Sequence, residues 1–324
     1  MTSASAASLH RTLSSAGIPC EPSVLLRDYT TFRIGGPATL LCRPQTEKQM
    51  TVALDIWRAY DGCPLFILGK GSNVLFSDAG FPGLVICTRD LQDVSLSEMH
   101  GNTVTIRAGC GVSLPTLSRR CASESPSLSG LEFACGIPGT VGGAVAMNAG
   151  AHGKEISDIV CESLCVDRTD GRLITLRRQD HAFSYRQSIY GQHPEWVLLH
   201  ASLSLIRADS SGVKSAMEQY LTARKKSQPL EYPSAGSIFR RPPVPDMYVG
   251  RMVEECGLKG FRIGDAEISE KHAGFIVNRG NATADDVRRL IAHIHKAVLL
   301  SFGIDLKCEI CVIRSDGRKE GGVY

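Results

Sequence analysis

Glycine is concentrated in one stretch of the chain in a way that suits the binding of a phosphate group. Residues 130–153 read GLEFACGIPGTVGGAVAMNAGAHG and hold seven of the 32 glycines. Glycine adopts positive φ angles and lets a ligand approach the backbone, but it costs conformational entropy, so such a cluster needs a reason. The small residues that follow can start a helix, where free amides favour anions. We predict a phosphate site at residues 136–143, although a buried loop between packed elements would also be rich in glycine.

A second glycine loop, GKGSN at residues 69–73, lies between two apolar runs that predict strands. Lys70 suggests a P-loop, but Pro64 stands where that motif needs its first glycine and Gly71 where it needs Ser or Thr. The sequence GCG at residues 109–111 lacks the third glycine of a Rossmann fingerprint. Two separate glycine loops therefore remain, and they can hold the two phosphates of a dinucleotide from opposite sides.

Length and composition are those of a globular protein of about two domains. The 324 residues are 43% hydrophobic and 21% charged. The net charge of +3 is too weak and too dispersed to predict nucleic-acid binding, but it suits an anionic small molecule. No apolar run approaches the length of a membrane span, and the first residues lack the basic start and apolar core of a signal peptide. We expect a cytoplasmic protein with no membrane, nucleic-acid or obligatory protein partner.

The twelve cysteines predict neither a metal site nor a disulfide framework. Several have apolar neighbours, as in the run LVIC at residues 84–87, which is typical of small buried hydrophobes. Cys308 and Cys311, like Cys161 and Cys165, lie in strand-like runs with no second pair or histidine at zinc spacing. Disulfide frameworks belong to small secreted chains. We therefore predict no metal.

The elements that position the loops predict an α+β protein whose character changes near residue 208. Helices are expected at residues 7–16, after Thr46, at 113–122, 214–226 and 249–256, and from Thr283 to Gly303. Strands are expected at residues 39–42, 65–68, 74–76, 84–87, 94–96, 104–106, 159–166, 173–176, 196–206, 274–278 and 306–313. The dipeptide Asp170-Gly171 predicts a hairpin turn, and the polar residues 315–324 predict a disordered tail.

Six motifs together resemble one known family. They are TFRIGGPA at residues 31–38, LGKGSNVL at 68–75, the glycine stretch at 130–153, YRQS at 185–188, SAGSIF at 234–239, and residues 264–278. In this order, over residues 25–313, they are similar to the UDP-N-acetylenolpyruvoylglucosamine reductases. The resemblance implies a flavin-binding half of the vanillyl-alcohol-oxidase/PCMH type, with subdomains at residues 1–90 and 91–208, and an α+β substrate-binding domain at residues 209–314.

The resemblance also implies FAD as the cofactor and NADPH as a co-substrate. Members of the family reduce the enolpyruvyl group of UDP-N-acetylglucosamine enolpyruvate to the lactyl ether, which gives UDP-N-acetylmuramate for peptidoglycan synthesis. FAD would occupy both glycine loops, where our own interpretation already places phosphates. The expected contacts are Gly69, Lys70, Gly71, Ser72, Asn73, Ile137, Pro138, Gly139, Thr140, Gly142 and Gly143.

Three residues match the catalytic positions of that family. Arg186 would pair with the carboxylate of the substrate and its developing charge, a task that suits a planar guanidinium. Ser237 would donate a proton to the carbanion carbon, and Glu309 would hold or polarise the enolate-like intermediate. On local sequence alone, the pattern favours a surface arginine for Arg186 and a residue on the solvated face of a strand for Glu309, while Ser237 is equally a turn serine.

The substrate contacts are expected around the same motifs. Tyr185 precedes the catalytic arginine, and the pyrophosphate needs cations, for which Arg240, Arg241 and the helix end at residues 224–226 are candidates. We favour Arg241, because cations at a helix end also serve the helix dipole. Only a few residues follow the YRQS motif before the next strand, so the chain resembles the shorter branch of the family, which lacks a tyrosine-bearing lid insertion.

Two other functions would use the same glycine loops. An oxidase of sugars or alcohols on this flavin fold would keep the loops but would not need Arg186, Ser237 and Glu309 together. A nucleotide-binding regulator would keep the cradle without the chemistry. Flavin absorption that NADPH bleaches and the enolpyruvyl sugar nucleotide restores would distinguish the reductase from both.

Overall fold

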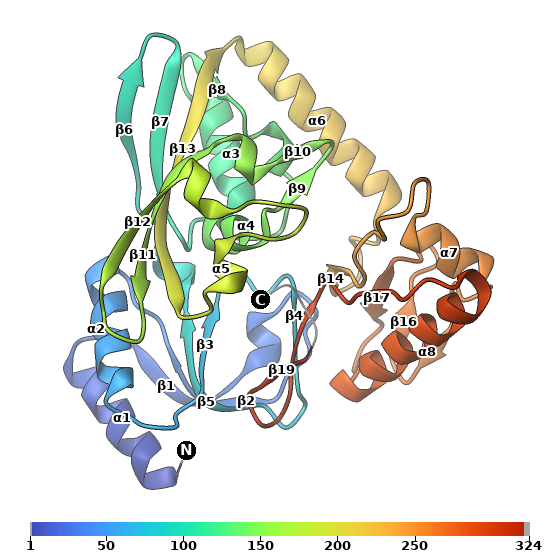
Figure 1. Cartoon of the computed structure of the whole chain (residues 1–324), viewed down its shortest axis with the longest axis horizontal. Helices are drawn as coiled ribbons and strands as arrows, with labels where there is room; N and C mark the ends of the chain where they lie inside the picture. The colour runs from blue at the N-terminus through green and yellow to red at the C-terminus, as the bar shows by residue number, and fades with distance from the viewer. Residues whose placement is uncertain (1, 321–324) are drawn as a thin grey trace.

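The N-terminal part of the chain folds around a four-stranded sheet. In this computed structural model, which describes residues 2–320, the strand order is β1 (Cys20–Leu25), β2 (Pro37–Cys42), β5 (Phe81–Cys87) and β3 (Leu65–Leu68). Helices α1 (Ser3–Ser15) and α2 (Glu47–Arg58) pack beside it (Figure 1). The predicted start of α2 is confirmed, because the Thr46 side chain accepts a hydrogen bond from the amide of Gln49 at 3.1 Å.

A six-stranded antiparallel sheet forms the next part. Its main path runs β12 (Leu173–Arg177), β11 (Val160–Asp167), β13 (Trp196–Ala208), β7 (Thr103–Gly109) and β6 (Val94–His100), and β8 (Ser127–Ser129) pairs with β13. The hairpin predicted at residues 170–171 is confirmed, with Leu164 opposite Thr175. Helix α3 spans Leu114–Ser123, and α4 (Val141–Met147) packs on β13 and β7.

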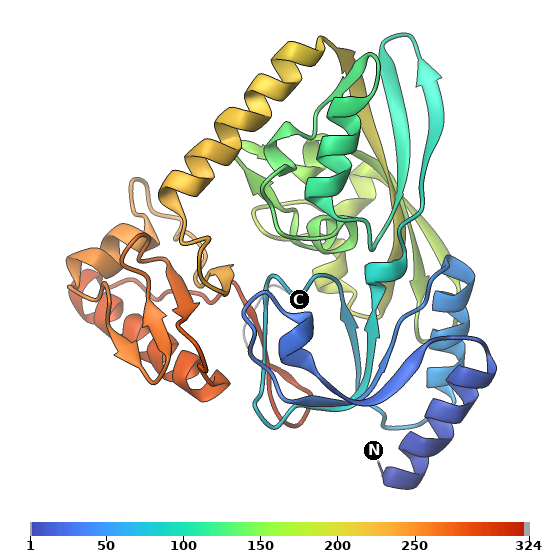
Figure 2. The same cartoon turned by 180° about the vertical axis from the view of Figure 1, so that it is seen from behind.

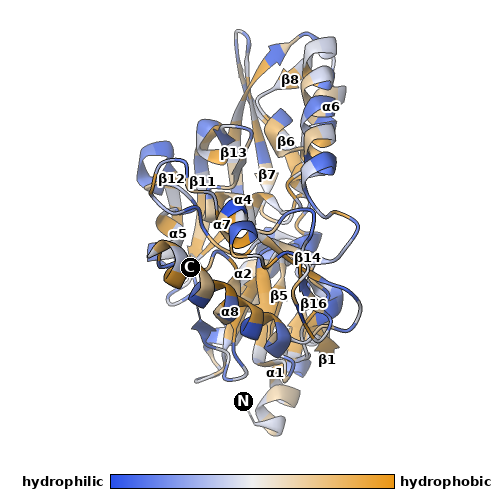
Figure 3. Cartoon of the chain, turned by 90° about the vertical axis from the view of Figure 1, so that its right-hand side faces the viewer, coloured by the Kyte–Doolittle hydropathy of each residue, from blue (hydrophilic) through white to orange (hydrophobic). Residues whose placement is uncertain are grey.

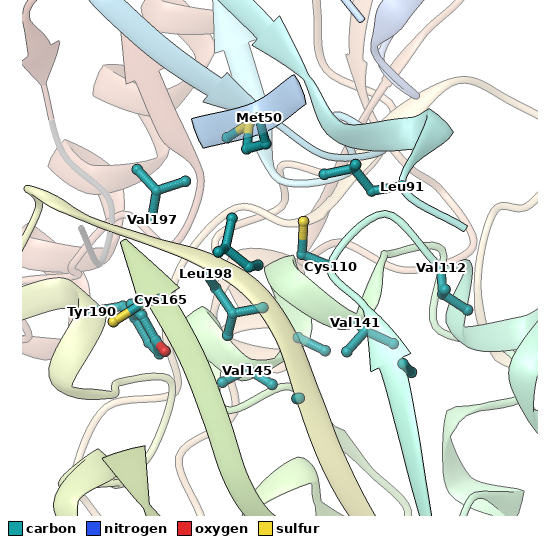
Figure 4. Packing of buried hydrophobic residues seen from close by; sticks show 14 of the residues in the cluster. Met50, Leu91, Cys110, Val112, Val141, Val145, Cys165, Tyr190, Val197 and Leu198 are labelled. Carbon is teal, nitrogen blue, oxygen red and sulfur yellow. The ribbon is translucent and has the colours of Figure 1, made fainter. Parts of the chain in front are cut away.

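One apolar core joins these two parts. Figure 4 shows Met50 of α2 in the same cluster as Val197 and Leu198 of β13 and Val141 of α4. The two glycine loops flank this core, since one follows β3 and the other precedes α4. Because packed interiors resist deformation, the core fixes the position of one loop relative to the other.

The C-terminal part is a smaller α+β unit connected by the long helix α6 (Ser210–Ser227), and both views place it to one side (Figures 1 and 2). Its sheet has the order β14 (Ser234–Ser237), β17 (Phe275–Asn278), β16 (Ala266–Ile268) and β15 (Arg262–Ile263), with α7 (Val249–Glu255) and α8 (Ala284–Phe302). The capping box between Thr283 and Asp286 starts α8 as predicted, and Gly303 ends it at φ +67°. Figure 3 shows hydrophobic and hydrophilic stretches alternating along α8.

The end of the chain returns to the N-terminal part, which corrects two predictions. The strand expected at residues 306–313 is only β18 (Cys311–Ile313), and it pairs in parallel with β4 (Val74–Phe76) rather than with the C-terminal sheet. The boundary predicted at residue 314 therefore falls inside the hairpin that β18 forms with the next strand. In the segment predicted to be a disordered tail, β19 (Lys319–Glu320) pairs with β18, while residues 321–324 lie outside the described residues.

The remaining elements are short. They are η1 (Leu26–Tyr29), η2 (Thr88–Asp90), η3 (Glu132–Ala134), η4 (Ile156–Asp158), η5 (Arg178–His181), β9 (Gly150–Ala151), β10 (Lys154–Glu155) and α5 (Ile189–Gln192). Across residues 2–320, none of the helices has the length and apolar character of a membrane span. Most cysteines are buried, and all are free thiols, in agreement with their expected role as small hydrophobes.

Candidate active site

A cavity of about 400 Å³ lies where the β-rich half meets the C-terminal part of the chain. Every residue predicted for catalysis or substrate binding lines it: Tyr185, Arg186, Ser237, Arg241 and Glu309. These residues come from three segments that are far apart in the sequence. The structure therefore brings together the whole set that the sequence analysis selected around the substrate.

Arg186 and Glu309 form an ion pair inside this cavity. Arg186 Nε lies 3.2 Å from Glu309 Oε1, and the two side chains are only 21% and 13% exposed. Arg186 Nη2 also donates to the carbonyl of Gly150 at 3.2 Å. Burial raises the pKa of the Glu309 carboxyl above its ordinary value, and the charge of Arg186 opposes that rise. Glu309 is thus not on a solvated strand face.

The turn that carries Arg186 holds it in an unusual backbone conformation. Ser184 and Gln187 exchange two backbone hydrogen bonds of 3.1 Å, so Tyr185 and Arg186 form the tip of a tight turn. Arg186 has a φ of +56°, a backbone angle that residues other than glycine and asparagine seldom adopt. Strain of this kind persists where the surrounding structure fixes it, and functional sites are common examples.

Ser237 lies at the end of strand β14, not in the turn that its neighbours suggest. Gly236 beside it has a φ of +81° and marks a shift in register between β14 and β17. The amide of Glu309 donates to the carbonyl of Ile238 at 2.7 Å, so the segments that carry Ser237 and Glu309 run side by side. Within residues 2–320 the Ser237 hydroxyl has no hydrogen-bond partner, which leaves it available to a ligand.

The glycine loop at residues 69–73 exposes a row of backbone amides. Within residues 2–320 the amides of residues 70–73 donate no hydrogen bond. Gly71 has a φ of +66° and lies so close to Tyr29 that a Cβ would clash with its carbonyl oxygen at 2.3 Å. Successive free amides around a left-handed residue form an anion-binding concavity. This loop therefore fits a phosphate.

The loop at residues 136–143 differs from its prediction. The amides of residues 141–144 are not free, because they donate to Val112, Cys110 and Thr140. The backbone amides at the start of α4 thus already have acceptors within the protein, and the expectation of free amides there was wrong. The loop nevertheless faces the first one, since a Cβ on Gly139 would lie 3.8 Å from Ser72 Oγ. The two glycine loops therefore lie next to each other.

Known proteins match both halves of the chain. A family model described as "FAD binding domain" matches residues 38–177, and one described as "UDP-N-acetylenolpyruvoylglucosamine reductase, C-terminal domain" matches residues 228–313. The UDP-N-acetylenolpyruvoylglucosamine reductase of Petrotoga mobilis is 41% identical over 93% of this chain and 97% of its own length. The chain belongs to the UDP-N-acetylenolpyruvoylglucosamine reductase family. It is thus an oxidoreductase with an FAD-binding domain.

Further members of this reductase family agree. The reductase of Caldanaerobacter subterraneus is 42% identical over 89% of this chain and 91% of its own. The crystal structure of the reductase from Thermus caldophilus superposes with a TM-score of 0.74 at 34% identity, covering 91% of this chain and 98% of that one. The predicted α+β class, with its FAD-binding half and its C-terminal domain, is confirmed.

The sequence analysis of this reductase missed a buried residue behind Arg186. Asn148 is 1% exposed and ends α4 with a φ of +45°. Its Nδ2 donates to the carbonyl of Ser184 at 3.0 Å and to Glu155 Oε2 at 2.7 Å. It therefore fixes the base of the turn that carries Arg186. An asparagine directly after a short helix is a signal for a left-handed cap, and it was available in the sequence.

The cavity of the reductase is rich in cations, most of which already have partners. Arg251 pairs with Glu255 at 2.7 Å, and Lys259 pairs with Glu254 at 2.7 Å. Arg241 makes no ion pair or hydrogen bond with any described residue, and its guanidinium carbon lies 4.3 Å from the ring centroid of Tyr248. Arg241 is therefore a free positive charge at the cavity.

Proposed function

We propose that the chain is an NADPH-dependent flavoenzyme that reduces the enolpyruvyl group of UDP-N-acetylglucosamine enolpyruvate to the lactyl ether, which yields UDP-N-acetylmuramate. The observation that carries this proposal is that Arg186, Ser237 and Glu309 line one cavity. An oxidase of sugars or alcohols would not need these three groups together. FAD, when bound, supplies hydride transfer to the vinyl carbon of the substrate.

The glycine loops are the proposed holders of FAD. The free amides of residues 70–73 suit its phosphates, because they offer donors that no other residue in the range 2–320 uses. The facing loop contributes Ile137, Pro138, Gly139, Thr140, Gly142 and Gly143. We assign this second loop to packing against the cofactor more than to anion binding, because the amides of residues 141–144 are already engaged.

Arg186 is the proposed partner of the carboxylate on the substrate. Its Nε and Nη2 groups are held by Glu309 and Gly150, so the rest of the guanidinium is fixed in direction. A fixed fork stabilises charge that develops on the carboxylate as the intermediate becomes enolate-like. Glu309, whose pKa burial raises above its ordinary value, is proposed to orient Arg186 through their ion pair and to help hold or polarise the intermediate.

Ser237 is the proposed proton donor. Its hydroxyl faces the same cavity and has no partner among the described residues, so it can approach the carbon that bears the carboxylate. Serine is a weak acid, yet a carbanion of the enolate type is basic enough to take its proton. The proton goes to that carbon, and solvent restores the hydroxyl after turnover.

Substrate binding is proposed to use Tyr185 and Arg241. Arg241 suits the pyrophosphate, because its charge has no competing partner in the described part of the chain. We also propose that the chain belongs to the shorter branch of the family, without a tyrosine-bearing lid. Only the short helix α5 fills the connection between the YRQS motif and β13.

The purified protein can test this function by its absorption. Under anaerobic conditions the bound flavin should bleach with NADPH and recover its colour on addition of the enolpyruvyl sugar nucleotide. Recovery with oxygen alone, and not with the sugar nucleotide, would favour an oxidase. Protein that stays colourless and takes up no FAD would indicate a nucleotide-binding regulator and would refute the proposal.

A further inference from the structure

Four of the five carbonyl groups of the loop at residues 69–73, those of Gly69, Lys70, Gly71 and Asn73, accept hydrogen bonds from other parts of the protein. Gly71 accepts from the amide of Thr31 at 3.0 Å, and Asn73 accepts from the amide of Cys311 at 2.9 Å. The carbonyls of Gly69 and Lys70 accept from the side chain of Arg89, at 3.3 Å and 3.1 Å. The amides of residues 70–73 are meanwhile free. The loop thus has a protein side of carbonyls and an open side of amides.

Arg89 holds two of these carbonyls, although it lies 20 residues after Gly69 and 19 after Lys70 in the sequence. It lies in η2, just after strand β5, and its Nη2 also donates to the carbonyl of Tyr29. Its guanidinium carbon lies 5.3 Å from the ring centroid of Tyr29, within the range of a cation–π contact. Among the described residues no carboxylate pairs with Arg89, so its charge is left to the three carbonyls.

We infer that Arg89 is a positioning residue for the phosphates of the dinucleotide. This inference rests on the proposed binding of FAD to the loop. By holding two carbonyls back, Arg89 keeps four consecutive amides turned toward the ligand, and its uncompensated charge lies behind them. The shape of the Arg89 guanidinium matters as well as its charge. Arg89 donates from two nitrogens, Nε and Nη2, to the carbonyls of Gly69, Lys70 and Tyr29, whereas a lysine has only one nitrogen to donate from.

Flavin binding to the apoprotein tests this role without relying on activity. FAD would be removed, and the affinities of the apoprotein for FAD and for riboflavin, which has no phosphate, would be measured by fluorescence titration. The variants are Arg89→Gln and Arg89→Lys. Arg43→Gln is the matched control, because Arg43 lies near Asp90, at 3.7 Å, without touching the loop. The thermal unfolding temperature of each apoprotein checks that it folds.

We expect Arg89→Gln to weaken FAD binding about 10- to 100-fold, as the loss of several charged hydrogen bonds requires. Arg89→Lys should recover part of that loss, and it serves as the test variant should Arg89→Gln not fold. Riboflavin binding and the Arg43→Gln control should stay close to the wild type. Unchanged FAD affinity, or an equal loss for FAD and riboflavin, would overturn the inference. A wild-type protein that binds no FAD would refute the proposed function instead.

Discussion

Asn73 donates a hydrogen bond from Nδ2 to the carbonyl of Glu309 at 3.2 Å. The carbonyl of the same Asn73 accepts from the amide of Cys311 at 2.9 Å. One residue of the loop that we assign to FAD therefore holds both sides of the segment that carries the proposed catalytic glutamate. This contact explains how a cofactor cradle in the N-terminal half and a carboxylate near the end of the chain keep a fixed relative position.

Replacing Asn73 by aspartate should disturb that connection. The aspartate side chain has no N–H group, and its carboxylate would face the Glu309 carbonyl, so the segment should shift. We expect reoxidation of the reduced flavin by the sugar nucleotide to slow at least about tenfold, with a loss of roughly 1–3 kcal/mol in stability. Stopped-flow absorption measures the first effect. Asn102→Asp is the control, because Asn102 Nδ2 makes the same kind of hydrogen bond, to the carbonyl of Arg207 at 3.0 Å, in an exposed position. Equal slowing of flavin reoxidation in both variants would contradict the proposed role of Asn73.

Ser237→Ala should separate the two half-reactions. Without the hydroxyl, the carbanion loses its proton donor, and general acid catalysis is worth about 10²- to 10⁴-fold in rate. Turnover of the sugar nucleotide should therefore be lost, while reduction of the flavin by NADPH survives. Ser234→Ala, on the same strand, is the control and should behave like the wild type. Loss of both half-reactions would indicate misfolding, and wild-type reoxidation would refute the role of Ser237.

Arg241→Gln should weaken binding of the sugar nucleotide rather than the chemical step. The free guanidinium is expected to contact the pyrophosphate, so KM for the sugar nucleotide should rise about tenfold with kcat little changed. Arg251→Gln is the control, because Arg251 lines the same cavity but is engaged by Glu255. Steady-state kinetics decide between them. A fall in kcat at constant KM would place Arg241 in the chemical step instead.

The stability of the protein should fall as the pH drops below the ordinary pKa of histidine, in part because of His181. This side chain is fully buried; its Nδ1 donates to the carbonyl of Arg177 at 2.9 Å and its Nε2 accepts from Ser163 at 2.7 Å. Burial lowers its pKa below 6.5, so the unfolded chain takes up a proton that the folded chain does not. This contribution to stability is present above pH 6.5 and is lost as the pH falls.

Urea unfolding of the wild type and of His181→Gln between about pH 8 and about pH 5 measures this dependence. Below about pH 6.5 the free energy of unfolding of the wild type should decline more steeply than that of the variant, by at most about 1.4 kcal/mol per pH unit. Other titrating groups are common to both proteins and cancel in the difference. Parallel curves would show that His181 does not take up a proton on unfolding.

Elements with strong local signals could be predicted from the sequence. Helix α8 begins at the capping box of Thr283 and ends at Gly303 because the local pattern fixes both ends. The cavity-lining residues could be selected because the YRQS and SAGSIF motifs resemble a family. Spacing alone would not have distinguished Arg186 or Ser237 from ordinary surface and turn residues.

What the sequence did not reveal depends on contacts between distant segments. Strand β14 was interpreted as a turn because its serines and Gly236 are typical turn residues, and its strand character comes from pairing with β17. The last strand was predicted to be longer than it is, because alternation of residue types cannot show where strand pairing starts or that β18 pairs with β4. Arg89 carries no motif at all, and its contacts to Gly69 and Lys70 appear only in the folded chain.

The most direct test of the account is the product of a reaction run in D₂O with NADPH and the enolpyruvyl sugar nucleotide. The arrangement of Arg186, Ser237 and Glu309 predicts a lactyl ether with deuterium on the carbon that bears the carboxylate, in a single configuration, because Ser237 exchanges with solvent and delivers from one side of the cavity. Nuclear magnetic resonance would locate that deuterium. Recovery of the intact enolpyruvyl group, or deuterium in both configurations at that carbon, would contradict it.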